Sequence, residues 1–255
     1  MNVVSPMPSA SDALKIPRAR VGLIIPSVNT FSEPQFNRFA PAGLGVHVAR
    51  ARVAGQWKRP LPEMADEIAT SAKLLSDCGP DVIVFHCTDT SMTQGPQGEG
   101  KILDIVQEAT GIAAMATSRL VLEALQRLGM TKVVLLTPYK TNKNIIDYLA
   151  ASGIGVVRDV ALAKAPMEFG KVTPQEWTEL AVKNDGPDAD GIFLSCTNTT
   201  QIDAIADIER LTGKPVVNSN QAVLWACLRR IGGTGGVPRL PALGQLFAQT
   251  ELATA

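Results

Sequence analysis

Two apolar segments of this chain end in a cysteine that is followed by a hydroxyl-rich loop. One reads Val-Ile-Val-Phe-His-Cys-Thr-Asp-Thr-Ser and breaks at Cys87, and the other reads Gly-Ile-Phe-Leu-Ser-Cys-Thr-Asn-Thr-Thr and breaks at Cys196. Short apolar runs of this kind are typical of buried strands in a parallel sheet. Open α/β sheets bind ligands at the carboxyl ends of their strands, where both cysteines stand. The repeat therefore predicts two like halves that bring two thiols to one cleft.

Strand-like and helical patterns alternate along the chain, which predicts parallel βαβ units and an α/β fold class. The expected strands cover residues 21–26, 46–53, 82–87 and 112–116 in the first half, and 132–137, 156–161, 191–196 and 215–218 in the second. The expected helices cover residues 64–78, 102–109, 118–128, 142–151, 174–183, 202–211 and 221–230.

The domain boundaries follow from this repeat. Residues 1–17 are rich in Ser, Pro and Ala and are predicted to be a disordered leader. Residues 18–117 are assigned to a first α/β lobe and residues 118–220 to a second, with residues 221–255 packing back on the first lobe. A chain of 255 residues is long enough to give both lobes substantial cores.

Composition excludes several classes of function. The formal net charge is zero and no Lys/Arg run occurs, so the sequence predicts no nucleic-acid partner. No apolar run is long enough to span a membrane, and no segment has the pattern of a signal peptide. Four cysteines without a secretion signal are expected to be reduced thiols of a cytoplasmic protein. No Cys-x-x-Cys motif or Cys/His cluster occurs, so we expect no metal site.

Cys87 and Cys196 are the candidate catalytic residues. A thiol acts as nucleophile or base only as thiolate, so its pKa must fall from about 8.5 toward neutrality, which N–H and hydroxyl groups of the following loop can bring about. The alternative is that a buried cysteine merely packs. Cys78 and Cys227 lack a polar loop and are assigned that structural role. The matched polar loops favour chemistry for the pair.

Other polar residues stand at equivalent strand ends. Asn29, in the segment Pro-Ser-Val-Asn-Thr, and Tyr139, after a proline, are candidate donors to a substrate carboxylate, or simply turn residues. His86 precedes Cys87, so on a strand it points to the opposite face and is predicted to pack there. Asp89 either orients a polar group in the cleft or caps the next turn.

The segment Gly-Pro-Gln-Gly-Glu-Gly-Lys over 95–101 has the glycine and lysine spacing of a P-loop. Ile102 follows, where Mg²⁺ binding requires Ser or Thr, and the segment begins well after the strand end. We therefore expect a flexible cleft loop or a lid rather than a nucleotide site.

These segments together resemble the aspartate/glutamate racemase superfamily, and within it the branch of maleate cis–trans isomerases and arylmalonate decarboxylases. The resemblance runs from about Val21 to Gly232. It rests on the Pro-Ser-Val-Asn-Thr segment, both strand-end cysteines, the Pro-Tyr turn, and the segment Asp-Ala-Ile-Ala-Asp-Ile-Glu-Arg-Leu-Thr-Gly-Lys-Pro-Val-Val over 203–217. It implies two flavodoxin-like lobes related by a pseudo-twofold axis, with the active site in the cleft between them and no cofactor.

The resemblance also assigns roles. Cys87 and Cys196 match the catalytic cysteines of the two lobes, and five positions match substrate-binding residues: Pro26, Asn29, Thr88, Tyr139 and Thr197. The implied substrate is a small carboxylate, and a homodimer or higher homo-oligomer is expected.

The resemblance leaves the reaction open. Cysteine stands at position 87, where arylmalonate decarboxylases have glycine, which counts against decarboxylation. Val28 stands where maleate isomerases usually have a second serine, and the loops after the cysteines are similar to those of amino-acid racemases. The leading prediction is maleate cis–trans isomerisation. The alternatives are a two-base racemase of an amino acid or hydantoin, an arylmalonate-type decarboxylase, and a non-catalytic carboxylate-binding protein.

Overall fold

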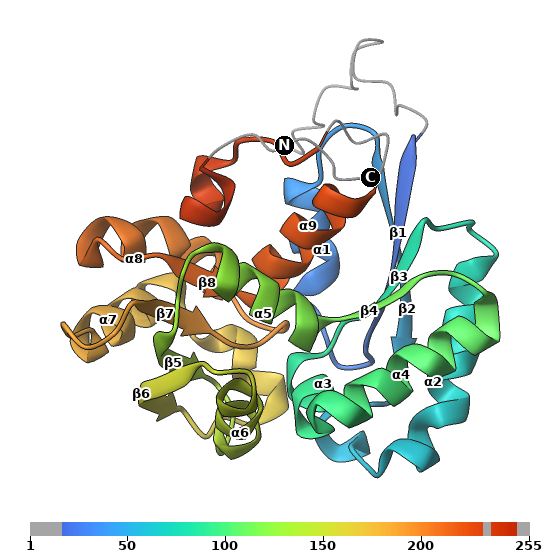
Figure 1. The fold of residues 1–255 in the computed structure, drawn as a ribbon, viewed down its shortest axis with the longest axis horizontal. Coiled ribbons are helices and arrows are strands. Elements are labelled where there is room, and N and C mark those ends of the chain that lie inside the picture. The colour runs from blue at the N-terminus through green and yellow to red at the C-terminus, as the bar shows by residue number, and fades with distance from the viewer. Residues whose placement is uncertain (1–16, 232–235, 249–255) are drawn as a thin grey trace, which may run out of the picture.

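Two four-stranded parallel sheets organise the protein, as the computed structural model of residues 17–231 and 236–248 shows (Figure 1). The first sheet has the order β2-β1-β3-β4, and its strands are β1 (Ala19–Pro26), β2 (Leu44–Ala51), β3 (Val82–Phe85) and β4 (Ala114–Ala116). The second sheet repeats this order as β6-β5-β7-β8, with β5 (Lys132–Thr137), β6 (Gly155–Ala161), β7 (Gly191–Leu194) and β8 (Val216–Asn218). This repeat of a flavodoxin-type order confirms the predicted fold class.

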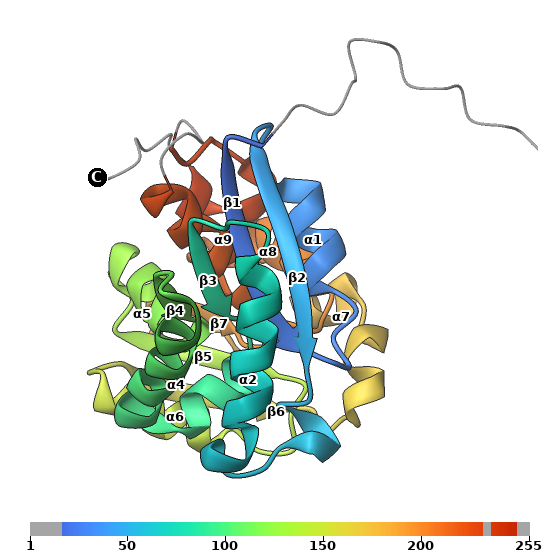
Figure 2. The same cartoon turned by 90° about the vertical axis from the view of Figure 1, so that its right-hand side faces the viewer.

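Helices cover both faces of the sheets. The first half contains α1 (Ser32–Phe39), α2 (Leu61–Ser76), α3 (Thr88–Thr93) and α4 (Gly95–Thr110). The second half contains α5 (Thr117–Arg127), α6 (Lys143–Ala151), α7 (Pro174–Asn184), α8 (Ile205–Thr212) and α9 (Ser219–Arg230). Figure 2 shows α2 and α4 on one side of the first sheet and α1 on the other. None of the helices in the described part of the chain is long and apolar enough to cross a membrane.

Local sequence signals explain why several of these strands and helices form where they do. Every residue of β3 and β7 is buried, as expected of central strands covered on both faces. Thr173 and Glu176 form a capping box at the start of α7, and Asn218 and Gln221 form one at the start of α9. Gly111 ends α4 in the left-handed region, where a side chain would be strained.

The two lobes meet at equivalent helices. α5 follows the last strand of the first sheet and α9 follows the last strand of the second, and these helices pack against each other at the centre of the molecule (Figure 1). One buried apolar cluster accordingly contains residues of both sheets, among them Leu23 and Leu135. The lobes therefore share a core across their junction, which fixes the geometry of any site between them.

Two sequence predictions need correction. Residues 95–101 form no loop or lid, because they are the first turns of α4. Short α1 and α3 follow strands β1 and β3 where only loops were expected. The domain boundaries stay predictions. α9 contacts α1 of the first lobe, and the turns at Pro241–Leu243 and Gln245–Phe247 lie against α8 and β8 of the second. Of the predicted leader, residues 1–16 lie outside the described residues.

A buried carboxylate joins the lobes away from both sheets. Glu99 of α4 is 1% exposed, and its Oε2 accepts hydrogen bonds from Ser118 Oγ and, at 2.6 Å, from Tyr148 Oη of α6. Arg119 Nε lies 3.3 Å from its Oε1. A carboxylate excluded from water requires such hydrogen-bond and ion-pair partners. All three partners lie on α5 and α6, so they tie α4 of the first half to helices of the second half.

Removing this carboxylate should destabilise the lobe junction. Glu99→Ala leaves two buried hydroxyls without their acceptor, so we expect the free energy of unfolding to fall by about 3 kcal/mol. The control is Glu108→Ala, an exposed position on the same helix, with an expected change below about 0.5 kcal/mol. Chemical denaturation of both variants measures the difference, and equal effects would show that the junction does not depend on Glu99.

Candidate active site

The two cysteines reach one cavity from opposite lobes. Cys87 follows the end of β3 and Cys196 follows the end of β7, and their exposed fractions are 4% and 3%. Both line a cavity of about 100 Å³, here called the reactive cavity. Its other lining residues are Pro26, Val28, Asn29, Ala54, Gly55, Asp89, Tyr139, Pro166, Phe169, Thr197 and Asn198. The carboxyl ends of β1, β3, β5 and β7 thus meet at this point, as the repeated strand ends predict.

Most of the predicted binding residues lie at the same place. Pro26, Asn29, Tyr139 and Thr197 line the reactive cavity. Thr88 does not, because its side chain turns toward α9 and its Oγ1 donates to Ser219 Oγ at 2.8 Å. The substrate-binding role that the resemblance implies for Thr88 stays a prediction. Its neighbour Asp89 reaches the cavity instead.

Hydrogen bonds across the lobes close one side of the cavity. Asn29 Nδ2 donates to Ser32 Oγ at 2.9 Å and to Thr197 Oγ1 at 3.1 Å. Asn198 Oδ1 accepts from the backbone N–H of Thr30 at 2.8 Å. The loop after β1 is thereby bonded to the loop after β7. Asn29 is thus a bridge between the lobes, and the hydrogen bonds of its amide hold the cavity wall in place.

Burial controls the acidity of both thiols. Burial, together with the charge of Asp89, raises the pKa of Cys87 to about 11, although a hydrogen bond with Thr90 and the charge of Lys58 oppose the shift. Burial also raises the pKa of Cys196 to about 12, against hydrogen bonds from Tyr139 and from the backbone N–H of Asn198. The lowered pKa expected from the loops is thus wrong, because desolvation of the two thiols outweighs the local donors.

The two thiols have different surroundings. Cys87 is the one in the field of a cation, Lys58. Cys196 instead receives a hydrogen bond from the Tyr139 hydroxyl, whose own pKa burial raises well above its usual value. Tyr139 therefore stays a donor at any physiological pH. This asymmetry suits a nucleophile at Cys87 and a proton donor at Cys196.

The pH dependence of thiol reactivity follows from these shifts. Iodoacetamide attacks only the thiolate, so its reaction rate with Cys87 should rise about tenfold per pH unit from neutrality up to near the pKa of about 11. The exposed Cys78, labelled in the same samples, is the internal control for decay of the reagent. Peptide mass spectrometry separates the two sites. A plateau for Cys87 below pH 9 would contradict the effect of burial.

An ion pair stands at the mouth of the cavity. Lys58 Nζ lies 2.7 Å from Asp89 Oδ2 and donates to Thr93 Oγ1 at 2.8 Å. Asn144 Nδ2 of α6 donates to the same hydroxyl at 3.1 Å. Sequence reasoning singled out Asp89 but missed Lys58, which lies far from any motif and reaches Asp89 only through the fold.

His86 is part of the packing behind the site. Its Nδ1 lies 3.0 Å from Thr117 Oγ1 and its Nε2 lies 2.8 Å from Asn220 Oδ1. Its ring packs edge-on against Phe36, and burial lowers its pKa to about 4. His86 is therefore a neutral, packed residue as predicted, and it does not activate Cys87.

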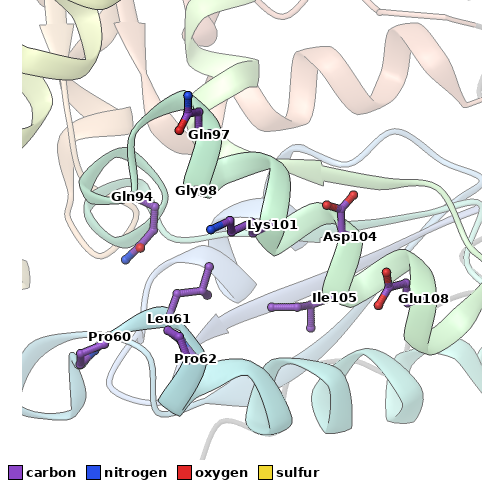
Figure 3. A pocket seen from close by; sticks show the side chains of 10 residues that line it. All are labelled: Pro60, Leu61, Pro62, Gln94, Gln97, Gly98, Lys101, Asp104, Ile105 and Glu108. Atoms are coloured by element: carbon purple, nitrogen blue, oxygen red, sulfur yellow. The ribbon is translucent and has the colours of Figure 1, made fainter.

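A larger cavity lies away from the cysteines. It has a volume of about 580 Å³ and lies between the beginning of α2, at Pro60 to Pro62, and α4 (Figure 3). Gly98 and Lys101 of the P-loop-like segment line it, but they are parts of a continuous helix and form no phosphate-binding loop. This cavity contains no thiol. Among the described residues, no group of three or more His, Cys, Asp and Glu is placed to hold a metal ion.

Comparisons with known proteins agree on one family. A family model described as arylmalonate decarboxylase matches residues 21–247. The chain is 27% identical over 242 residues to a maleate isomerase of Geobacillus stearothermophilus, which covers 88% of this chain and 96% of that protein. It is 30% identical over 190 residues to an arylmalonate decarboxylase of Bordetella bronchiseptica, with coverage of 72% and 78%. A solved glycine-to-cysteine variant of arylmalonate decarboxylase, associated with sulfate, is similar with a TM-score of 0.78 and 26% identity over 90% of this chain and 100% of that one.

Proposed function

This chain belongs to the arylmalonate decarboxylase family, and from that membership we propose that it is a cofactor-independent isomerase that converts maleate into fumarate. The observation that carries the proposal is the pair of thiols, Cys87 and Cys196, in one buried cavity formed by both lobes. A maleate isomerase among the relatives, similar over nearly its full length, supports the choice of reaction.

The proposed mechanism uses the two thiols in turn. Cys87 releases its proton to solvent water when the substrate binds, and its sulfur adds to one carbon of the double bond, so that a C–S bond forms as the π bond breaks. The electron pair moves onto the neighbouring carbon and its carboxylate. The central bond is now single and rotates. The electron pair then re-forms the double bond and expels the Cys87 thiolate, which leaves the trans product.

Cys196 and Tyr139 act on the developing charge. The Cys196 thiol lies in the same cavity with a pKa of about 12, so it is protonated and can give a proton to the carbanionic carbon and take it back. The Tyr139 hydroxyl and the backbone N–H of Asn198 already bond to its sulfur and stabilise the charge it acquires when the proton leaves.

The volume of the reactive cavity separates two substrate classes. It is about 100 Å³ in the ligand-free protein. A cavity of roughly 150 Å³ is what a benzene ring alone occupies in a protein core. The volume of the reactive cavity accommodates a short unbranched dicarboxylate at the thiols, whereas the ring of an arylmalonate would extend into the space that adjoins the reactive cavity at Tyr139 and Phe169.

One observation favours a second candidate, a two-base amino-acid racemase. Asp89 lines the reactive cavity beside the thiols and could accept hydrogen bonds from a substrate ammonium group. Its Oδ2 is already paired with Lys58, and this pairing offsets the negative charge that would attract an ammonium group. We therefore rank this reaction second.

A substrate panel tests the proposal. The protein is incubated with maleate, phenylmalonate, and the D- and L-forms of aspartate, in buffer containing a metal chelator, and the products are followed by proton NMR and by optical rotation. We expect fumarate from maleate and no change in the other three. Carbon dioxide release from phenylmalonate, or loss of rotation from either aspartate, with maleate unchanged, would contradict the proposal.

The predicted homo-oligomer and cytoplasmic location stay predictions. Light scattering on the purified full chain measures the mass in solution, and a dimer or larger assembly is the expected result.

A further inference from the structure

A second, open chamber adjoins the reactive cavity. Its volume is about 490 Å³, and it shares Gly55, Asp89, Tyr139, Pro166 and Phe169 with the reactive cavity. We call it the outer chamber. Its remaining lining residues are Gln56, Lys58, Lys140, Thr141, Asn144 and Lys164. The two spaces therefore meet at the residues they share.

The outer chamber is the open side of the site. Hydrogen bonds that join Asn29 to Thr197 and Thr30 to Asn198 hold together the loops after β1 and β7, which line the reactive cavity but not the outer chamber. The aromatic rings of Tyr139 and Phe169 pack edge-on where the two spaces meet. The outer chamber therefore offers a small molecule a route from solvent to the thiols, between these shared residues.

The charges in the outer chamber are unbalanced. Three lysines line it, Lys58, Lys140 and Lys164, against one aspartate, Asp89. Asp89 is paired with Lys58 at 2.7 Å. Lys140 and Lys164 are exposed, and neither makes an ion pair with any residue in the described ranges. Glu176 lies in the field of Lys164, but its carboxylate is engaged in capping α7 through Thr173. Glu176 therefore offsets part of the charge of Lys164, and the rim keeps a net positive charge from Lys140 and Lys164.

The backbone holds these two lysines on one rim. Lys140 follows the turn after β5, and Lys164 follows β6. The backbone N–H of Ala163 donates to Tyr139 O at 2.8 Å, and that of Lys164 donates to Pro138 O at 2.9 Å. Ala163 adopts a φ of 52°, which is uncommon for a residue with a side chain. A strained residue held by its neighbours points to a conformation kept for a function.

We propose that the outer chamber is an anion-binding antechamber, in which Lys140 and Lys164 capture the carboxylate of an incoming substrate before it passes to the thiols. The substrate class is a small organic anion, and its capture deepens the isomerase function proposed above, on which the identity of that anion rests. A partly enclosed basic surface raises the local concentration and the association rate of anions. The ion pair of Lys58 with Asp89 keeps the aspartate from repelling the anion at the shared residues.

The test uses two thiol reagents of nearly equal size, the anion iodoacetate and the neutral iodoacetamide. Their rates of reaction at Cys87 and Cys196 are measured by peptide mass spectrometry on the full chain, and the ratio of the two rates is taken at each cysteine. The ratio cancels the thiolate fraction, which is the same for both reagents. Cys78, exposed and outside both cavities, supplies the reference ratio.

At low salt, we expect the ratio of the iodoacetate rate to the iodoacetamide rate to be about tenfold higher at the cavity thiols than at Cys78, a size typical of electrostatic attraction. At about 0.5 M salt this excess should shrink, because salt screens the lysine charges. The double variant Lys140→Gln with Lys164→Gln should lose the excess. The double variant with arginine at both positions should keep it. Lys101→Gln, in the separate cavity between α2 and α4, is the matched control and should change nothing.

Enzyme kinetics give an independent reading if maleate proves to be the substrate. The double glutamine variant should then raise KM several-fold with little change in kcat, because capture precedes the chemical step. The labelling ratio does not depend on turnover, so a failed maleate assay leaves this test intact. An unchanged ratio in the double glutamine variant, or an equal loss in the double arginine variant, would overturn the antechamber.

Discussion

Cys87→Ala and Cys196→Ala are each expected to lower kcat for maleate by at least about a thousandfold, as removal of a residue that exchanges bonds with the substrate commonly does. Each thiol performs a step that no neighbouring group can take over. Neither change should unfold the protein, because loss of one buried sulfur costs only about 1 kcal/mol of stability. Steady-state kinetics and thermal unfolding are measured on the same preparations.

Cys227→Ala is the matched control for these variants. Cys227 is fully buried in α9 and lines neither cavity, so its loss removes a sulfur from the core without touching the site. The control should lose as much stability as the other two and keep its activity. Activity retained in Cys87→Ala would make Cys87 a packing residue and leave a one-thiol reaction as the better explanation.

Asn29→Ala and Tyr139→Phe are expected to reduce kcat/KM by about 10- to 150-fold, which corresponds to about 1.5–3 kcal/mol for a hydrogen bond to a charged group. The two variants should differ in character. Asn29→Ala removes the bonds to Ser32 and Thr197 and should also lower stability, whereas Tyr139→Phe removes one hydroxyl beside Cys196 and should mainly lower kcat.

The exposed Cys78→Ala is the control for both and should leave stability and kinetics unchanged. If Asn29→Ala and Tyr139→Phe proved as harmless as this control, both residues would be turn residues only. The family and the fold would stand, but the binding roles assigned to these positions would not.

The sequence predicted the sheets well because buried parallel strands are continuous apolar runs. The expected strand over 132–137 coincides with β5, and those that end in cysteine were placed within two residues of β3 and β7. The repeated cysteine was enough to predict a shared cleft, because parallel strands of like halves end at equivalent edges. Neither inference required any contact between distant residues.

The features that the sequence did not predict depend on tertiary contacts. The helix over Gly95–Thr110 starts in a glycine-rich turn that reads locally as a loop, and packing of its later residues Ile102 and Val106 stabilises it. The pair of Lys58 with Asp89 joins residues that no motif links. The raised pKa of both thiols reflects complete burial, which a polar loop sequence does not reveal.

The most direct test of the central claim is to trap the sulfur that adds to the substrate. The Cys196→Ala variant is incubated with maleate, and the intact mass and peptide masses are measured, with Cys87→Ala treated alongside. We predict that Cys196→Ala gains the mass of one maleate on Cys87, because the carbanion formed on addition takes up a proton from solvent and no Cys196 thiolate is present to remove it, and that Cys87→Ala stays unmodified. An adduct on Cys196, or no adduct on either variant while the wild-type protein converts maleate into fumarate, would contradict it.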